Sequence, residues 1–154
     1  MAGLLVQAMI AHFDSVFEGP NGDYPAVVET LAGVSVVQAL WKPVPTQNSI
    51  WQIVEHLSAS KEWQIGMLQD GHPASPVWIE PAGDEIAWQA SLARLKEAHQ
   101  RLKLVLQGVV EADLLKVPVP EWGDTLLELI LSSGPAHEAH HCGQIDYIKG
   151  LQAG

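Results

Sequence analysis

Apolar side chains recur at every third or fourth position over four long stretches of this chain, a spacing typical of amphipathic helices. The stretches cover residues 3–17, residues 49–69, residues 84–107, and residues from about 125 to 148. No convincing strand pattern is present, because the β-branched run at 34–37 is short and leads into a turn-rich segment. The pattern therefore predicts an all-α fold, with a four-helix bundle as the leading architecture.

Long loops and short extra helices are expected between these stretches. Short helices are predicted around residues 26–31 and 35–41. A proline-rich connection from Pro73 to Gly83 and a loop from Gly108 to Gly123 follow the second and third long helices. The length of the first connection suggests either a crossover between distant helix ends or a loop that lines a pocket mouth.

Two of the long helices carry a capping-box pattern at their start. Ser49 with Gln52, and Thr125 with Glu128, have the spacing at which each side chain can bond an unpaired backbone N–H. The second and fourth long helices are therefore expected to begin at these residues.

Composition and charge narrow the classes of function. The 154 residues, 47% of them hydrophobic, fit a single domain over residues 1–154 with a real core. A formal net charge of −10, with 18 acidic and 8 basic residues, argues against nucleic-acid and anionic-membrane partners. The single cysteine, the absence of a signal-peptide pattern and the lack of a long apolar run predict a cytoplasmic protein.

Histidines provide the clearest candidate chemistry. His137 and His141 are four residues apart, so a helix would place both rings on one face, close enough to share a metal ion. His56 lies on the inward stripe of another predicted helix. Three histidines would leave an open position on a divalent ion, although a pair at this spacing also occurs by chance.

Other polar and aromatic residues have simpler interpretations. A lone inward histidine such as His99 is expected to be structural, with a fourth ligand as the alternative. His140 should point about 100° away from His137. Cys142 is expected to be buried and inert. The six tryptophans are expected to form core and pocket wall, with a cofactor-binding cluster as the alternative, and Trp51 or Trp63 could shape a cavity near His56.

Residues 137–141 also match the H-E-x-x-H pattern of zinc peptidases, in which two histidines bind zinc and the glutamate activates water. That chemistry needs a third ligand downstream. Gln144 stands where the longer pattern requires its glycine, and no glutamate follows His141. The peptidase interpretation is therefore disfavoured.

Three segments make the chain resemble the DinB / YfiT-like superfamily of bacterial metal-binding four-helix bundles. Ser49–Leu57 resembles the second-helix segment with the first histidine ligand. His137–Ile145 resembles the fourth-helix segment with the other two. Thr30–Ser35, with Ala39 and Pro43 after it, resembles the early short-helix region. The order and separations fit along nearly the whole chain.

The resemblance implies that His56, His137 and His141 bind a divalent ion, with nickel or zinc the usual identities and water completing the shell. Many relatives are homodimers. Some are transferases that activate a low-molecular-weight thiol, and many are described as metal-dependent hydrolases. The chain departs from the family pattern at His140, where an aromatic residue is common, and at Pro135, which should kink the helix before the ligand pair.

These observations suggest a metal-dependent enzyme that activates water or a low-molecular-weight thiol for hydrolysis or S-transfer to a small-molecule substrate. Glu138 is the candidate catalytic proton acceptor, against the simpler interpretation of a solvated surface carboxylate. Gln144 and Asp146 could orient a ligand. The alternative is a non-enzymatic metal or small-ligand binding module, or a structural dimer.

Overall fold

Helices form the regular structure of the computed structural model, which describes residues 2–71, 73 and 75–154; no strand occurs within these ranges. In chain order the elements are α1 (Leu4–Phe17), α2 (Val27–Leu31), α3 (Val36–Leu40), α4 (Ile50–Gln69), α5 (Glu85–Gln107), the 3₁₀ helix η1 (Glu111–Leu115), α6 (Leu126–Leu131), the π-helical turn η2 (Ser132–Ala136) and α7 (His137–Ala153). The predicted all-α class is confirmed. None of the helices described has the length and apolar character that a membrane span requires.

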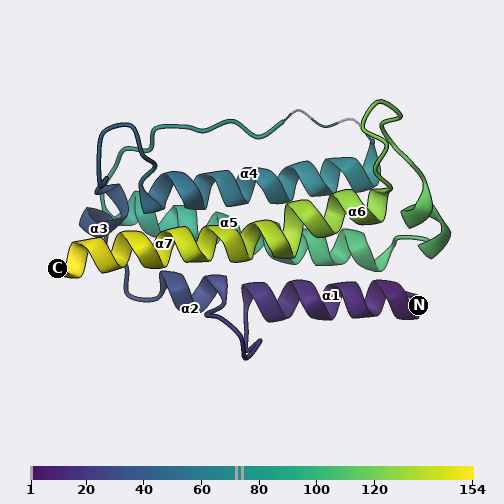
Figure 1. Cartoon of the computed structure of the whole chain (residues 1–154), viewed down its shortest axis with the longest axis horizontal. Coiled ribbons are helices and arrows are strands. Elements are labelled where there is room, and N and C mark those ends of the chain that lie inside the picture. Colours follow the sequence, from purple (N-terminus) through teal and green to yellow (C-terminus); the bar gives the residue numbers. More distant parts are fainter. Residues whose placement is uncertain (1, 72, 74) are drawn as a thin grey trace.

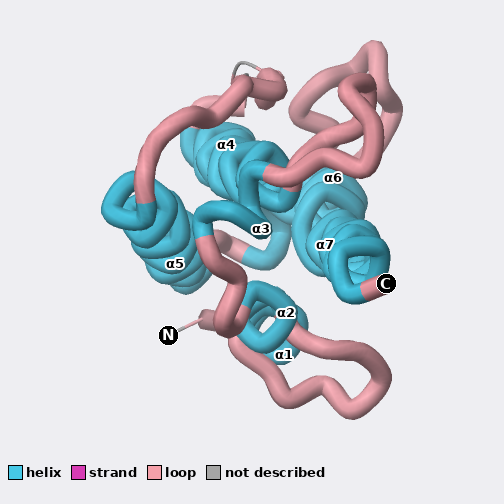
Figure 2. The backbone as a smooth tube through the Cα atoms, turned by 90° about the vertical axis from the view of Figure 1, so that its left-hand side faces the viewer, coloured by secondary structure: helices cyan, strands magenta, loops and turns pink. Residues whose placement is uncertain are grey.

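The long helices run lengthwise beside one another and form a helical bundle (Figure 1). Helix α4 packs against α5 and α7, and α1 packs against α5 and α7. Viewed from the end, α4, α5, α6–α7 and the α1–α2 segment surround a common interior, and α3 lies across it (Figure 2). This packing brings α4 and α7, which carry the candidate metal ligands, into direct contact.

Both predicted capping boxes are present. The Ser49 hydroxyl accepts a hydrogen bond from the Gln52 backbone N–H at 3.2 Å, and Gln52 Oε1 accepts one from the Ser49 N–H at 2.9 Å. Thr125 and Glu128 make the same exchange, at 3.3 and 2.8 Å. The box at Ser49 stabilises the start of α4, the helix that carries His56.

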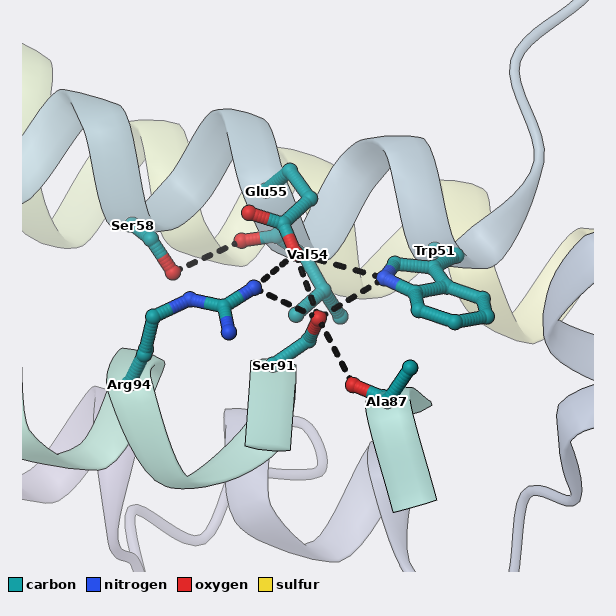
Figure 3. Close-up of polar contacts among 7 residues, drawn as sticks. All are labelled: Trp51, Val54, Glu55, Ser58, Ala87, Ser91 and Arg94. Atoms are coloured by element: carbon teal, nitrogen blue, oxygen red, sulfur yellow. Dashed lines mark hydrogen bonds and ion pairs between the residues drawn. The ribbon is translucent and has the colours of Figure 1, made fainter. Parts of the chain in front are cut away.

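Polar contacts between α4 and α5 hold the turn of α4 that precedes His56 (Figure 3). The Trp51 indole N–H donates to Ser91 Oγ at 2.8 Å. Arg94 donates to Ser91 Oγ at 2.8 Å and to Glu55 Oε1 at 2.7 Å. Trp51 therefore packs at the α4–α5 interface.

The core consists of two apolar clusters along the bundle. One includes Phe17, Val54, Leu57, Leu95, Cys142 and Ile145. The other includes Phe13, Ile65, Leu102, Leu106 and Ile130. Lys61, His99 and Glu138 are buried at positions between members of the two clusters along their own helices. We call these three residues the buried polar layer.

The fourth predicted helix is divided by a kink. Helix α6 ends at Leu131, and α7 begins at His137 after the π-helical turn that contains Pro135. Proline has no N–H to donate, so the helical ladder is interrupted there. Within the turn Gly134 has non-helical angles (φ −100°, ψ −106°), and Gln64 Nε2 donates to the Ser133 carbonyl at 2.7 Å. The kink predicted from Pro135 is confirmed.

The connection between α4 and α5 runs along α4 (Figure 1). Residues 72 and 74 of this connection lie outside the described part. Pro73 packs closely on α4 at Gly66, where an added Cβ would lie 2.6 Å from Pro73 Cβ. The connection therefore covers the helix that carries His56. This agrees with the prediction that it lines a pocket mouth.

Candidate metal centre

Three imidazole rings from two helices meet at one point. His137 Nε2 lies 3.2 Å from His56 Nε2 and 2.9 Å from His141 Nε2. One ring nitrogen from each histidine lies within 4.8 Å of the other two. The predicted convergence of His56, on α4, with the pair on α7 is therefore present in the structure.

The sequence of α7 explains how the pair reaches this point. His137 is the first residue of α7, directly after the kink, and His141 follows one turn later on the same face. His56 is partly buried on the face of α4 that α7 covers. Two helix faces thus supply all three rings, so the arrangement depends on the α4–α7 contact.

The set of donor atoms fits a divalent transition metal. Imidazole nitrogens bind such ions at about 2.1 Å, so ligands at right angles lie about 3.0 Å apart and tetrahedral ligands about 3.4 Å apart. The two measured separations, 2.9 and 3.2 Å, fall close to this range. Three neutral nitrogens suit zinc, nickel, copper or iron, so they leave the metal's identity open.

Burial keeps these rings neutral. Loss of solvent, together with the charge of a neighbouring histidine, lowers the pKa of His56, His137 and His141 to about 4 each. A metal binds the neutral imidazole, so these ligands need to release no proton at neutral pH.

Gln144 orients His141, as the sequence suggested. Gln144 Oε1 lies 2.7 Å from His141 Nδ1, so that nitrogen carries the proton and Nε2 is left to bind a metal. The Gln144 amide nitrogen lies 3.1 Å from Nε2 of the exposed His140. Asp146, the other expected orienting residue, lies at the surface 3.8 Å from Lys149.

A tryptophan that sequence analysis missed packs on the centre. The Trp78 indole stacks on the His56 ring, with centroids 4.0 Å apart and planes 6° from parallel. It also approaches the His141 ring edge-on at 6.0 Å. Trp78 comes from the irregular connection before α5, where no periodic pattern could indicate its direction.

A cavity of about 280 Å³ opens beside two of the histidines. His56 and His137 form part of its wall, together with Trp63 from α4 and Trp122 from the loop before α6. Trp63 thus has the pocket role expected for a tryptophan near His56. The arrangement places a space for a small molecule directly against candidate metal ligands.

Comparison with known protein families agrees with this geometry. The sequence model of the DinB superfamily matches residues 23–145. The chain belongs to the DinB superfamily. No match was found among curated proteins or among solved structures. The matched range contains all three histidines, so DinB membership and the three-histidine cluster are both compatible with metal binding.

Glu138 has a different environment in this DinB protein from the one expected. Its side chain is 1% exposed and forms an ion pair with Lys61, so the interpretation as a solvated surface carboxylate is wrong. Burial raises the pKa of Glu138 and lowers the pKa of Lys61, and their mutual attraction opposes both shifts. The second carboxylate oxygen of Glu138 has no hydrogen-bond partner among the described residues.

His99 and Cys142 have the structural roles predicted for them. His99 is fully buried, with Nδ1 3.1 Å from Lys61 Nζ and Nε2 2.9 Å from Asp14 Oδ1. His99 therefore belongs to the buried polar layer and is absent from the three-histidine cluster. Cys142 is buried, and burial raises the pKa of its thiol to about 11, which keeps it protonated and unreactive.

Proposed function

We propose that this DinB protein is a metal-dependent enzyme that uses water or a low-molecular-weight thiol as a nucleophile. The observation that carries the proposal is the meeting of the Nε2 atoms of His56, His137 and His141 beside a small-molecule cavity, whose wall includes His56 and His137. Nickel and zinc are the candidate ions. Hydrolysis and S-transfer are the two candidate reactions.

Each residue of the proposed site has a separate role. The three histidines hold the ion, and Gln144 fixes the ring of His141 so that Nε2 faces it. A divalent ion bound there lowers the pKa of water or a thiol, which supplies a nucleophile near neutral pH. The cavity beside His56 and His137 admits the substrate. Glu138 as proton acceptor stays a prediction, and its ion pair with Lys61 would have to loosen first.

A non-enzymatic metal or ligand binding module is the second candidate, and one observation favours it. Among the described residues that line the cavity, none is a carboxylate that could act as a general base. Metal-loaded protein can be screened against ester and amide substrates, and against electrophiles with several thiols. Turnover that is lost in His141→Ala supports the enzyme, and its absence across the panel supports the binding module.

Metal content tests the site itself. Untagged protein purified without chelator should contain close to one equivalent of nickel, zinc or a similar ion by elemental mass spectrometry. His56→Ala and His141→Ala should each lose it, because two imidazoles hold an ion far more weakly than three. His12→Ala, which removes an exposed histidine on α1, is the control and should keep the metal. Metal retained in both ligand variants would refute the site.

Two further expectations concern the protein in the cell. A homodimer and a cytoplasmic location stay predictions. Sedimentation equilibrium of the metal-loaded protein would test the first, with twice the chain mass as the expected result.

A further inference from the structure

Two tryptophans line the cavity beside the histidines, and their rings stack on each other. The Trp63 and Trp122 rings have centroids 6.4 Å apart and planes 24° from parallel. Trp63 is held on α4, whereas Trp122 lies in a loop and is 51% exposed. The cavity therefore has one wall fixed on a helix and one carried by a loop.

The two rings form a stacked aromatic pair at the cavity wall. Such a pair presents flat apolar faces and edges, which suit contact with a planar apolar group.

The remaining polar groups of the cavity are uncharged. Three hydroxyl-bearing residues line the cavity: Ser60, Ser75 and Ser133. No Lys, Arg, Asp or Glu is among the described lining residues. Without a bound ion, the cavity offers an anionic guest no cationic side chain, in a chain of net charge −10. A cationic guest would be attracted to the indole faces but repelled by a bound divalent ion.

We infer that this cavity binds an uncharged, planar, largely apolar group of the substrate against the Trp63–Trp122 pair, with the reacting atom toward His56 and His137. The inference rests on the proposed function, because it names the substrate class of the same site. A volume of about 280 Å³ limits the guest to a small ring system with a short substituent. The serine hydroxyls can bond a neutral polar substituent.

Three probes with one ring system test the charge preference. They are 2-naphthalenemethanol, 2-naphthoate and 2-naphthylmethyl-trimethylammonium, and equilibrium dialysis measures their binding. The metal-free protein is included because a carboxylate can bind a metal directly. The uncharged probe should bind at least about tenfold more tightly than the carboxylate to the metal-free protein, and at least about tenfold more tightly than the ammonium to the metal-loaded protein. Equal or tighter binding of the charged probe in either comparison would overturn the inference.

Variants test the position of the ring. Trp122→Ala should weaken binding of the uncharged probe about tenfold or more, because stacking on an aromatic side chain contributes at this level. Trp122→Phe should retain most of the affinity. Trp41→Ala, which removes a similarly exposed tryptophan just after α3, should leave binding unchanged. Unchanged binding in Trp122→Ala would overturn the inference.

Metal content measured on the same samples separates the two proposals. If His56→Ala and His141→Ala retain metal while the protein binds the neutral probe tightly, the metal site is refuted and the pocket is supported. If the metal-loaded protein has no affinity for the neutral probe, only the proposed binding of a planar group in the pocket is refuted.

Discussion

At the scale of single residues, protons compete with a metal ion for the candidate ligands only at acidic pH. Burial lowers the pKa of each of the three rings to about 4, against an ordinary value of 6.5. An exposed histidine cluster would begin to lose metal just below neutral pH. These rings are instead already neutral throughout the physiological range.

Metal affinity should therefore be nearly constant from pH 7.5 to about 5 and fall steeply below that. Dialysis against buffered zinc, followed by elemental analysis, would measure the affinity. A loss that sets in near pH 6.5 would contradict the lowered pKa values.

The same shifts affect the stability of the metal-free protein. In the unfolded chain these histidines bind protons near pH 6.5, whereas in the folded chain they bind protons only near pH 4. The pKa of His99 is also lowered to about 4 by burial. The unfolded state thus holds more protons between these limits, so stability falls as pH falls through this window. Urea midpoints at pH 7 and pH 5.5 should show the decrease in metal-free protein.

Sequence reasoning could identify the ligands and missed what surrounds them. His56, His137 and His141 were predictable because helical spacing fixes the direction of a side chain. Trp78 and Trp122 lie in irregular loops, where direction depends on tertiary packing, so no pattern indicated their positions. Glu138 was misplaced because Lys61, its partner, is a lysine in the interior of α4, which composition rules assign to the surface.

At the scale of elements, the kink between α6 and α7 sets where the ligand pair begins. Gly134 lies against Phe13 of α1, and a Cβ added there would be 2.5 Å from Phe13 Cζ. The absence of a side chain at Gly134 therefore allows α1 to approach the kink closely. Pro135 predicted the kink from sequence, but the contact with Phe13 needed the three-dimensional structure.

Gly134→Ala should destabilise the protein by about 1–3 kcal/mol, because the added methyl group overlaps an aromatic ring in the core. Gly150→Ala is the matched control on α7, since nothing lies within 4 Å of its added Cβ. It should raise stability by up to about 1 kcal/mol through helix propensity. Thermal or urea unfolding measures both, and equal effects would contradict the steric explanation.

At the scale of the whole molecule, the buried polar layer joins helices that lie far apart in the sequence. Lys61 of α4 pairs with Glu138 of α7 and contacts His99 of α5, which in turn bonds Asp14 of α1. The layer lies between the two apolar clusters of the core. Its polar partners must meet in one arrangement, so it favours a single register of the four long segments.

Lys61→Met should destabilise the protein by about 3–5 kcal/mol, because Glu138 would remain buried without its cation. Lys103→Met, which removes the partly exposed partner of Asp14, should cost about 1 kcal/mol or less. Urea unfolding measures both losses, and similar values would contradict the assigned burial effect.

The double variant Lys61→Met/Glu138→Leu should recover most of that stability, since both charges are then removed together. Its metal content also bears on Glu138. Full metal binding by a stable double variant would show that the layer is separate from ligand binding.

The separation of 81 positions between His56 and His137 in the sequence has a consequence for synthesis on the ribosome. A nascent chain that has completed α4 and α5 carries one imidazole of the three and cannot yet capture an ion tightly. Binding at the proposed metal site must wait until α7 has emerged and docked on α4. Acquisition of metal would then report that the polypeptide has reached its native topology.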